Sequence, residues 1–178
     1  MTVLAIGTAD SGKSALAEDL AVRTGDGRRY YLATMKVCDD EGRKREEKHR
    51  KMREGKGFVT IERECALSGI TDDIDEPGEA TVLLECVSNL VGNVLHDRPE
   101  RITHLKSDGS GKSAFADEVA ADIAELAAKV RNLIIVTNEY TMEDGYDEET
   151  RLYVELLGIV NGRLRDIADR TFDLGGNI

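Results

Sequence analysis

A glycine-rich segment near the N-terminus constrains the fold of this chain more than any other stretch. Residues 7–14 read Gly-Thr-Ala-Asp-Ser-Gly-Lys-Ser, follow the apolar run Val3–Ile6 and precede the helical pattern Ala15–Ala21. Strand, glycine loop and helix in this order form a phosphate-binding loop, because backbone N–H groups and the positive end of the helix then point at phosphate oxygens. The sequence therefore predicts a site for a nucleoside triphosphate, GTP or ATP.

Two side chains of this loop are expected to carry chemistry. Lys13 is placed to reach the β- and γ-phosphates, and the Ser14 hydroxyl is placed to bind Mg²⁺. The residues expected to surround the phosphates are Gly7, Thr8, Ala9, Asp10, Ser11, Gly12, Lys13 and Ser14. The alternative is a glycine turn before a helix with an incidental lysine, which the flanking strand and helix make less probable.

Length and composition limit the class of protein. A chain of 178 residues with 40% hydrophobic content fits one α/β domain. The net charge of −11 argues against nucleic acid or an anionic membrane as a partner. No apolar run long enough to span a membrane and no secretory leader is visible, so we expect a cytoplasmic protein. Cys38, Cys65 and Cys86 lack the spacing of a zinc site or a disulfide framework and are expected to be buried or incidental thiols.

The rest of the chain alternates between strand-like and helix-like patterns. We expect further strands at 29–34, 58–62, 80–86 and 133–137, and helices at 87–96, 114–130 and 151–168. Between residues 38 and 56 the chain is highly charged, with good helix formers and few apolar positions, which indicates a solvated helix or a working surface. The acidic segments 71–80 and 140–149 are expected to be turns and solvated connections.

Polar side chains follow two of these strands. Glu85 lies at the end of a buried-strand pattern, where an acid can hold Mg²⁺ beside a phosphate loop. A strand that ends in Glu by chance is the alternative. Asn138 and Glu139 follow the strand at 133–137 and are expected at the same edge of the sheet.

A second segment echoes the phosphate loop. Ser110–Ala116 repeats the Ser-Gly-Lys-Ser-Ala pattern of Ser11–Ala17, but Lys106 stands where the motif needs a glycine. We therefore expect the start of a helix there and not a second phosphate site. His96 and His104 flank the preceding loop without a third ligand at metal spacing and are expected to be surface residues.

Several segments together resemble the bifunctional adenosylcobinamide kinase/adenosylcobinamide-phosphate guanylyltransferase family of cobalamin biosynthesis. The resemblance covers nearly the whole chain, and the order and spacing of its motifs are more specific than any one of them. In chain order they are Ser11–Ser14 with Ala17-Glu18, Tyr31–Thr34, Asp39–Glu41 with Arg45 four residues before His49, Thr60 with Glu62, Leu83–Cys86, Val136–Glu139, and Asn161, Leu164 and Ala168-Asp169.

The resemblance implies a fold, an activity and a set of site residues. It implies a RecA-like, three-layer P-loop α/β fold with a mainly parallel, mixed central sheet, assembled as a homotrimer. It implies phosphorylation of adenosylcobinamide and transfer of GMP from GTP to the product, giving adenosylcobinamide-GDP. His49 is the residue implied to take GMP covalently. The further residues implied to bind nucleotide are Ala33, Thr34, Met35, Arg50, Lys51, Met52, Arg53, Glu62 and Glu85.

The chain departs from the family pattern in two places. Ile6 and Asp10 stand where the phosphate loop usually has a glycine and an arginine, and an acid in the loop repels the ligand. Arg53-Glu54 and Phe58 stand where the family commonly has Arg-Pro and Trp.

The residues themselves leave alternatives open. His49 lies among cations that suit a triphosphate whose α-phosphorus is attacked, but a histidine on a solvated, charged helix is the plain alternative. The protein is then a P-loop kinase of another small metabolite, with the charged helix as a lid, or a nucleotide-binding regulator without turnover, as Asp10 suggests. Glu139 and Asp40 are the candidate bases for an acceptor hydroxyl in a kinase step.

Overall fold

The computed structural model describes residues 1–24, 27–37, 40–97, 100, 102, 105 and 109–175. Cys38, Asp39, His104 and Lys106, each the subject of a sequence-based prediction, lie outside the described residues.

Six parallel strands form a single sheet in the order β3-β2-β4-β5-β1-β6. They are β1 (Thr2–Gly7), β2 (Arg29–Ala33), β3 (Phe58–Glu62), β4 (Thr81–Glu85), β5 (Asn132–Asn138) and β6 (Arg170–Asp173). Every neighbouring pair of these strands runs parallel. The mixed sheet that the resemblance implied is therefore, over the described residues, a wholly parallel one.

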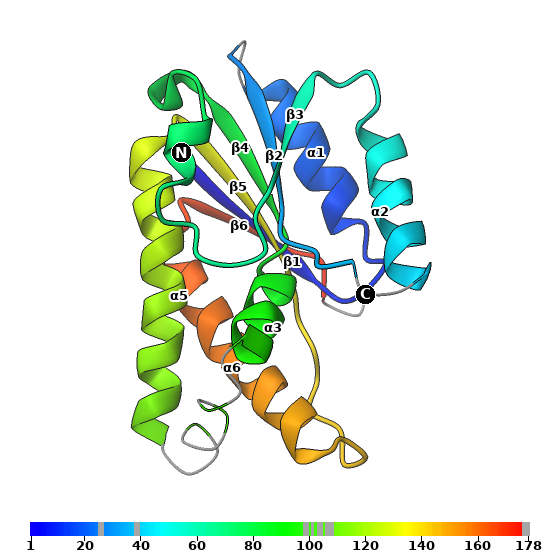
Figure 1. Ribbon diagram of the computed structural model, residues 1–178, viewed down its shortest axis with the longest axis vertical. Coiled ribbons are helices and arrows are strands. Elements are labelled where there is room, and N and C mark those ends of the chain that lie inside the picture. The colour runs from blue at the N-terminus through cyan, green and yellow to red at the C-terminus, as the bar shows by residue number, and fades with distance from the viewer. Residues whose placement is uncertain are drawn as a thin grey trace.

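Helices cover both faces of the sheet, as Figure 1 shows. They are α1 (Lys13–Arg23), α2 (Asp40–Arg53), α3 (Val87–Asp97), α5 (Gly109–Lys129) and α6 (Glu148–Ile167), with short 3-10 helices η1 (Ile70–Asp73) and η2 (Pro77–Glu79) in the acidic segment before β4. Helices α3, α5 and α6 gather at one side, and α1 and α2 lie at the other (Figure 1). The result is the three-layer α/β fold expected of a parallel sheet, whose crossover helices bury both of its faces.

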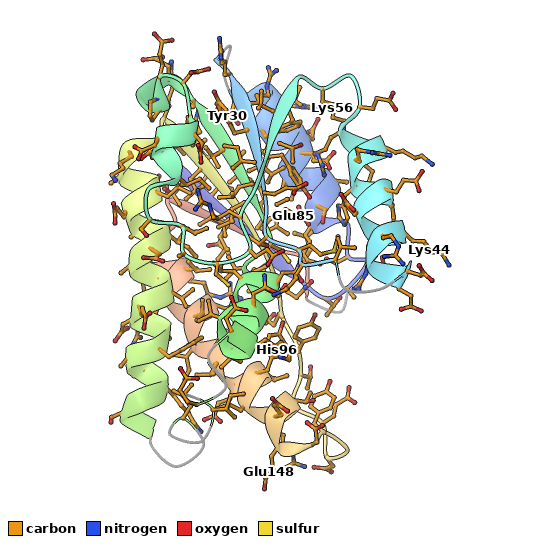
Figure 2. The ribbon with its side chains drawn as sticks, in the orientation of Figure 1. Tyr30, Lys44, Lys56, Glu85, His96 and Glu148 are labelled. Atoms are coloured by element: carbon orange, nitrogen blue, oxygen red, sulfur yellow. The ribbon has the colours of Figure 1, made fainter. Side chains whose placement is uncertain are left out.

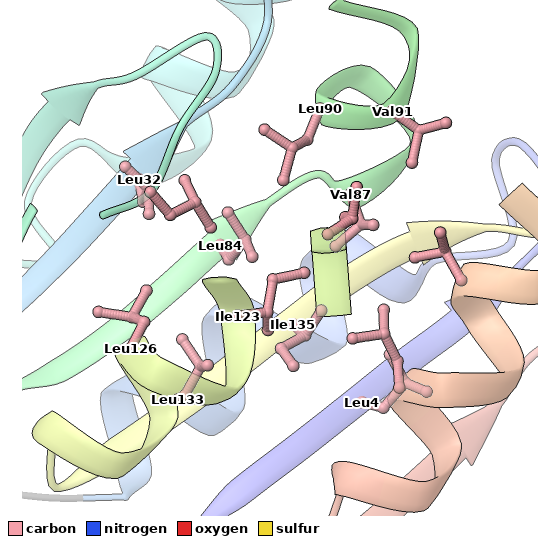
Figure 3. Packing of buried hydrophobic residues seen from close by; sticks show 14 of the residues in the cluster. Leu4, Leu32, Leu84, Val87, Leu90, Val91, Ile123, Leu126, Leu133 and Ile135 are labelled. Carbon is pink, nitrogen blue, oxygen red and sulfur yellow. The ribbon is translucent and has the colours of Figure 1, made fainter. Parts of the chain in front are cut away.

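The core follows from the two-residue period of the central strands. In β1, Leu4 and Ile6 face the cluster under α3, α5 and α6, and Val3 and Ala5 face the smaller cluster under α1. Strand β5 repeats the alternation, with Leu133 and Ile135 on the first side and Ile134 and Val136 on the second. Figure 3 shows Ile123 and Leu126 of α5 packed over Leu84, Leu133 and Ile135. Continuous apolar runs such as 133–136 are thus strands buried on both faces.

The structure adds one strand and moves two helix boundaries. Strand β6 pairs with β1 at the sheet edge, and the sequence prediction missed it because only Phe172 of its four residues is partly buried. Helix α6 begins at Glu148, three residues earlier than expected, because the Asp147 side chain accepts a hydrogen bond from the Thr150 N–H at 2.7 Å and caps the helix. Helix α5 begins at Gly109 and not at Ala114.

The echo of the phosphate loop is part of a helix. Ser110–Ala116 lies within α5, and Lys112 is paired with Glu155 of α6 at 2.8 Å. The lysine therefore serves helix packing, and the expectation of a helix start there is confirmed.

Parallel pairing brings the functional strand ends to one edge. β1, which leads into the phosphate loop, and β4, which ends in Glu85, are separated only by β5. Gly7 pairs with Asn138 and Glu85 with Val136, while Ala33 pairs with both Glu85 and Glu62. Side chains far apart in sequence thus meet beside the phosphate loop.

The central packing gives a stability prediction. Leu84 is fully buried, so Leu84→Ala should lower the free energy of unfolding by about 3 kcal/mol, within the range for buried leucines. Val59 is 49% exposed on the edge strand β3, so Val59→Ala should change it by less than about 0.5 kcal/mol. Urea denaturation of both variants measures the difference, and equal losses would contradict this assignment of the core.

Candidate active site

The phosphate loop has the backbone of an anion site. Asp10 and Gly12 adopt left-handed conformations, with φ of 57° and 84°, on either side of Ser11. Such alternation turns successive N–H groups toward one point and makes a concave site for an anion. Gly7 is needed for close packing, because a Cβ there would lie 2.7 Å from the Ser11 Oγ. The Lys13 ammonium donates to the Thr8 carbonyl at 2.9 Å, which holds it across the loop.

Ser14 and Glu85 form the polar centre of the site. The Ser14 hydroxyl donates to Oε1 of Glu85 at 2.7 Å and joins the start of α1 to the end of β4. Burial raises the pKa of Glu85 to about 7, although the Ser14 hydrogen bond acts in the opposite direction. The second oxygen, Oε2, is buried and has no hydrogen-bond partner in the described part of the chain. A buried carboxylate oxygen without a partner, next to a hydroxyl, fits Mg²⁺, which binds oxygen ligands and fills its remaining positions with water and phosphate.

A cavity of about 660 Å³ opens between the phosphate loop, the carboxyl edge of the sheet and α2. Figure 2 shows Glu85 near the middle of the molecule, whereas Lys44 points outward from α2. Twelve predicted binding or catalytic residues line this cavity: Ala9, Asp10, Gly12, Lys13, Ser14, Ala33, Met35, His49, Met52, Arg53, Glu62 and Glu85. The cavity is therefore the place at which most of the sequence-predicted site comes together.

One face of the charged helix α2 forms a wall of this cavity. Arg45, His49, Met52 and Arg53 recur at the spacing of one helical face, and all four line the cavity. The Arg53 guanidinium lies 3.5 Å above the ring of Tyr31 on β2, a cation–π contact that fixes how the end of α2 is turned. One side of α2 is thus exposed to solvent, and the other side lines the cavity.

His49 is held half-buried on that wall. Its Nδ1 is buried and finds no hydrogen-bond partner among the residues described. Burial and, next, the charge of Arg53 lower the pKa of His49, while the Glu18 carboxylate opposes them. The imidazole is therefore neutral near pH 7, the form in which a ring nitrogen has a free electron pair.

Several predicted site residues lie elsewhere. Arg50 and Lys51 are exposed and do not line the cavity. They border a neighbouring groove beside Phe58, which shares Arg53 with the cavity. Thr34 is buried and exchanges hydrogen bonds of 2.7 and 2.8 Å with the Cys86 backbone, so it braces the end of β4. Gly7, Thr8 and Ser11 shape the loop without lining the cavity.

The remaining candidates are also accounted for. Glu139 and Asp40 do not line the cavity and pair instead with Arg165 and Arg43, respectively. His96 is exposed, as expected. Cys65 and Cys86 are free thiols, and Cys86 is buried at the cavity floor.

Some lining residues were not predicted from the sequence. Tyr31, Asn89 and Asn138 border the cavity from β2, α3 and the end of β5. Asn138 was expected at this edge of the sheet but without a role. Tyr31 borders the cavity because β2 lies next to β4 in the sheet. The sequence alone does not give this strand order.

The fold and the site define a P-loop nucleotide-binding α/β protein. The model of the cobinamide kinase/cobinamide phosphate guanyltransferase family matches residues 3–174, and the chain belongs to this family. It is accordingly an enzyme of cobalamin synthesis that uses a nucleotide substrate.

Two known proteins illustrate the similarity. The chain is 33% identical, over 180 residues, to the bifunctional adenosylcobalamin biosynthesis protein CobU of Escherichia coli (strain K12), covering 97% of this chain and 94% of that protein. The flagellar accessory protein FlaH from Methanocaldococcus jannaschii superposes with a TM-score of 0.50 at 12% identity, over 97% of this chain and 70% of FlaH. The likeness to FlaH concerns the fold alone. None of the helices in the described ranges has the length and apolar character needed to cross a bilayer.

The charge of Asp10 gives a prediction about affinity. Asn tolerates the left-handed backbone of this position but carries no charge, so Asp10→Asn should remove a repulsion from the phosphates without new strain. We expect GTP to bind about two- to fivefold more tightly, the effect of one solvent-screened charge. Calorimetric titration at low and high salt measures it, and the gain should shrink at high salt. Unchanged affinity at low salt would mean that the Asp10 carboxylate does not face the phosphates.

Proposed function

We propose that this enzyme phosphorylates adenosylcobinamide and then guanylylates the product through a GMP–His49 intermediate. The observation that carries the proposal is the shared cavity, which has Lys13, Ser14 and Glu85 on one side and His49 on the facing helix. A bound triphosphate is thereby exposed to both sets of groups.

The kinase step would rely on the phosphate loop. Lys13 and the loop N–H groups stabilise negative charge on the γ-phosphoryl group as the cobinamide hydroxyl attacks it. The nucleoside diphosphate leaves, and the hydroxyl becomes a phosphate ester. Ser14 and Glu85 would hold Mg²⁺, which when bound neutralises charge on the β- and γ-phosphates. GTP or ATP is the phosphoryl donor.

The guanylyl step would use His49. The neutral imidazole attacks the α-phosphorus of GTP, a P–N bond forms, and pyrophosphate leaves with the electron pair of the broken P–O bond. The phosphate of adenosylcobinamide phosphate then displaces the histidine and yields adenosylcobinamide-GDP. In a single-step transfer the anionic acceptor phosphate would have to attack the anionic triphosphate of GTP. With two steps, the attack on GTP is made by a neutral nucleophile.

The structure and the family membership bear on the competing interpretations. A kinase of another small metabolite needs no histidine on the cavity wall, and a regulator without turnover needs no carboxylate with a free oxygen beside the phosphate loop. The homotrimer and the cytoplasmic location stay predictions. Light scattering of the purified protein measures the number of chains directly.

Removing the proposed nucleophile separates the two activities. His49→Ala should abolish the GMP adduct and guanylyl transfer, whereas phosphorylation of adenosylcobinamide should persist because Lys13, Ser14 and Glu85 remain. Intact-mass analysis after incubation with GTP measures the adduct, and a radiolabelled phosphate assay measures the kinase step. Because His49 is half-buried and makes no hydrogen bond at Nδ1, we expect a stability loss of less than about 1 kcal/mol.

Lys13→Ala is the matched comparison for His49→Ala. It should slow both activities, since one phosphate loop serves both steps. A folded His49→Ala protein that still formed the adduct would contradict the role of His49. Loss of only one activity in Lys13→Ala would contradict the shared site.

The pH dependence follows from the environment of His49. Its pKa lies below the ordinary value of about 6.5 because of burial and the nearby Arg53. With Mg²⁺ at saturation, so that Glu85 stays ionised, the rate of adduct formation should thus fall toward acid with a midpoint below pH 6.5, as the imidazole takes a proton. Quenched-flow measurement of the adduct gives this profile, and a fall centred above pH 6.5 would contradict the assignment.

A further inference from the structure

The structure contains a buried carboxylate that the proposed reaction does not use. Glu18 lies on α1, one turn beyond the phosphate loop, and its side chain has 0% exposure. Its Oε2 accepts a hydrogen bond from the Lys56 ammonium at 2.6 Å. Its Oε1 is buried and has no hydrogen-bond partner within the described ranges. A buried carboxylate with one free oxygen is costly, so a second partner is expected.

The matching free group is on His49. Its Nδ1 is likewise buried and without a partner in the described part of the chain. Both residues lie on the same side of the sheet, because Glu18 belongs to α1 and Arg53, one turn after His49, stacks on Tyr31 of the α1-facing cluster. The Glu18 charge also raises the pKa of His49, Tyr31 and Glu85, so the carboxylate is near enough to interact with all three.

We propose that Glu18 is the positioning residue of His49: with nucleotide in the cavity, its Oε1 accepts the Nδ1–H of the imidazole, so that Nε2 presents its electron pair to the α-phosphorus. This inference rests on the proposed GMP–His49 intermediate. The proposed hydrogen bond gives a partner to both Glu18 Oε1 and His49 Nδ1, the two buried atoms described above. It also gives a chemical reason for the buried Glu18 carboxylate on α1, on the side of the sheet where α2 carries His49.

The atoms of the step balance with the proton held in place. As the Nε2–P bond forms and pyrophosphate leaves, the imidazole becomes positively charged, and its Nδ1–H stays hydrogen-bonded to the negative Glu18. When the acceptor phosphate attacks, the N–P bond breaks and the electron pair returns to Nε2. No proton leaves the ring in either step. The carboxylate thus stabilises the charged intermediate and fixes the tautomer.

Lys56 orients the carboxylate. It belongs to the turn between α2 and β3, its side chain is 39% exposed, and Figure 2 shows it near the end of α2. By holding Oε2 it leaves Oε1 for His49. The other charges that act on His49 are Arg45, Lys48 and Arg53 of α2, all of which lower its pKa, so Glu18 is the one opposing charge among the groups that shift it most.

Glu18→Gln tests the proposal. The amide oxygen of Gln would accept from Lys56, and its NH₂ group would then face Nδ1 and favour the tautomer with the proton on Nε2. We expect adduct formation to slow by at least about tenfold, as for other histidines that lose a carboxylate partner, with the affinity for GTP unchanged. The acid limb of the rate profile should move to lower pH, because a negative charge beside the imidazole is lost. In the complex with a GTP analogue that has a methylene bridge between the α- and β-phosphorus, ¹⁵N NMR should show the Nδ1–H tautomer in the parent protein and the Nε2–H tautomer in Glu18→Gln.

Lys56→Gln is the matched control. It keeps an N–H donor for Oε2 and keeps the Glu18 charge, so adduct formation should stay within about fivefold of the parent, the range for a part-exposed ion pair. Its acid limb should not move to lower pH. Equal slowing in both variants without a shift of either profile would mean that Glu18 only tethers the turn after α2, and would overturn the proposal.

The same experiment separates this inference from the proposed function. If the parent protein forms no adduct, the GMP–histidine step is wrong, whatever the NMR spectra show. If it forms the adduct on His49 and Glu18→Gln leaves rate, profile and tautomer unchanged, only the role of Glu18 is wrong. Thermal unfolding of each variant checks that the compared proteins are folded.

Discussion

The hydrogen bond between Ser14 and Glu85 is the contact on which the site depends. It joins the first turn of α1 to the end of β4, across the strand β5 that separates β1 from β4. Parallel pairing makes this contact possible, because every strand of the described sheet ends at the same edge. The apolar faces of these strands bury both sides of the sheet and hold the edge rigid. The polar residues at that edge are therefore preorganised for an anion and a cation before either binds.

Much of the fold was predictable because its signals are local. The phosphate loop is a contiguous motif between a strand and a helix, and the apolar runs at 80–86 and 133–137 are long enough to mark buried strands. Strand β6 was missed because it carries almost no apolar pattern and depends on its pairing with β1. The start of α6 was misplaced because the cap at Asp147 is a single side-chain hydrogen bond within an acidic segment. The wholly parallel pairing of the described strands is a tertiary property that no single segment encodes.

The site was predictable in part, for the same physical reason. The phosphate-loop motif predicts Lys13 and Ser14, and the end of a strand pattern predicts Glu85. The orientation of α2 is instead fixed by contacts between residues far apart in sequence, namely Arg53 with Tyr31 and Lys56 with Glu18. These contacts turn Arg45 and His49 toward the cavity and Arg50 and Lys51 away from it. A charged helix without an apolar stripe gives no sequence signal for that choice. Glu18 was visible in the sequence as part of a motif. Only the structure shows that its side chain is fully buried and therefore does not serve as an ordinary solvated helix residue.

We propose that one cavity presents a bound triphosphate to both the phosphate loop and His49. Peptide mapping of the protein after incubation with GTP tests it most directly, with digestion and separation kept at neutral to alkaline pH because a phosphoramidate is labile to acid. We expect a single GMP, attached to the peptide that contains His49. GMP attached to another residue, or release of pyrophosphate without any adduct, would contradict it.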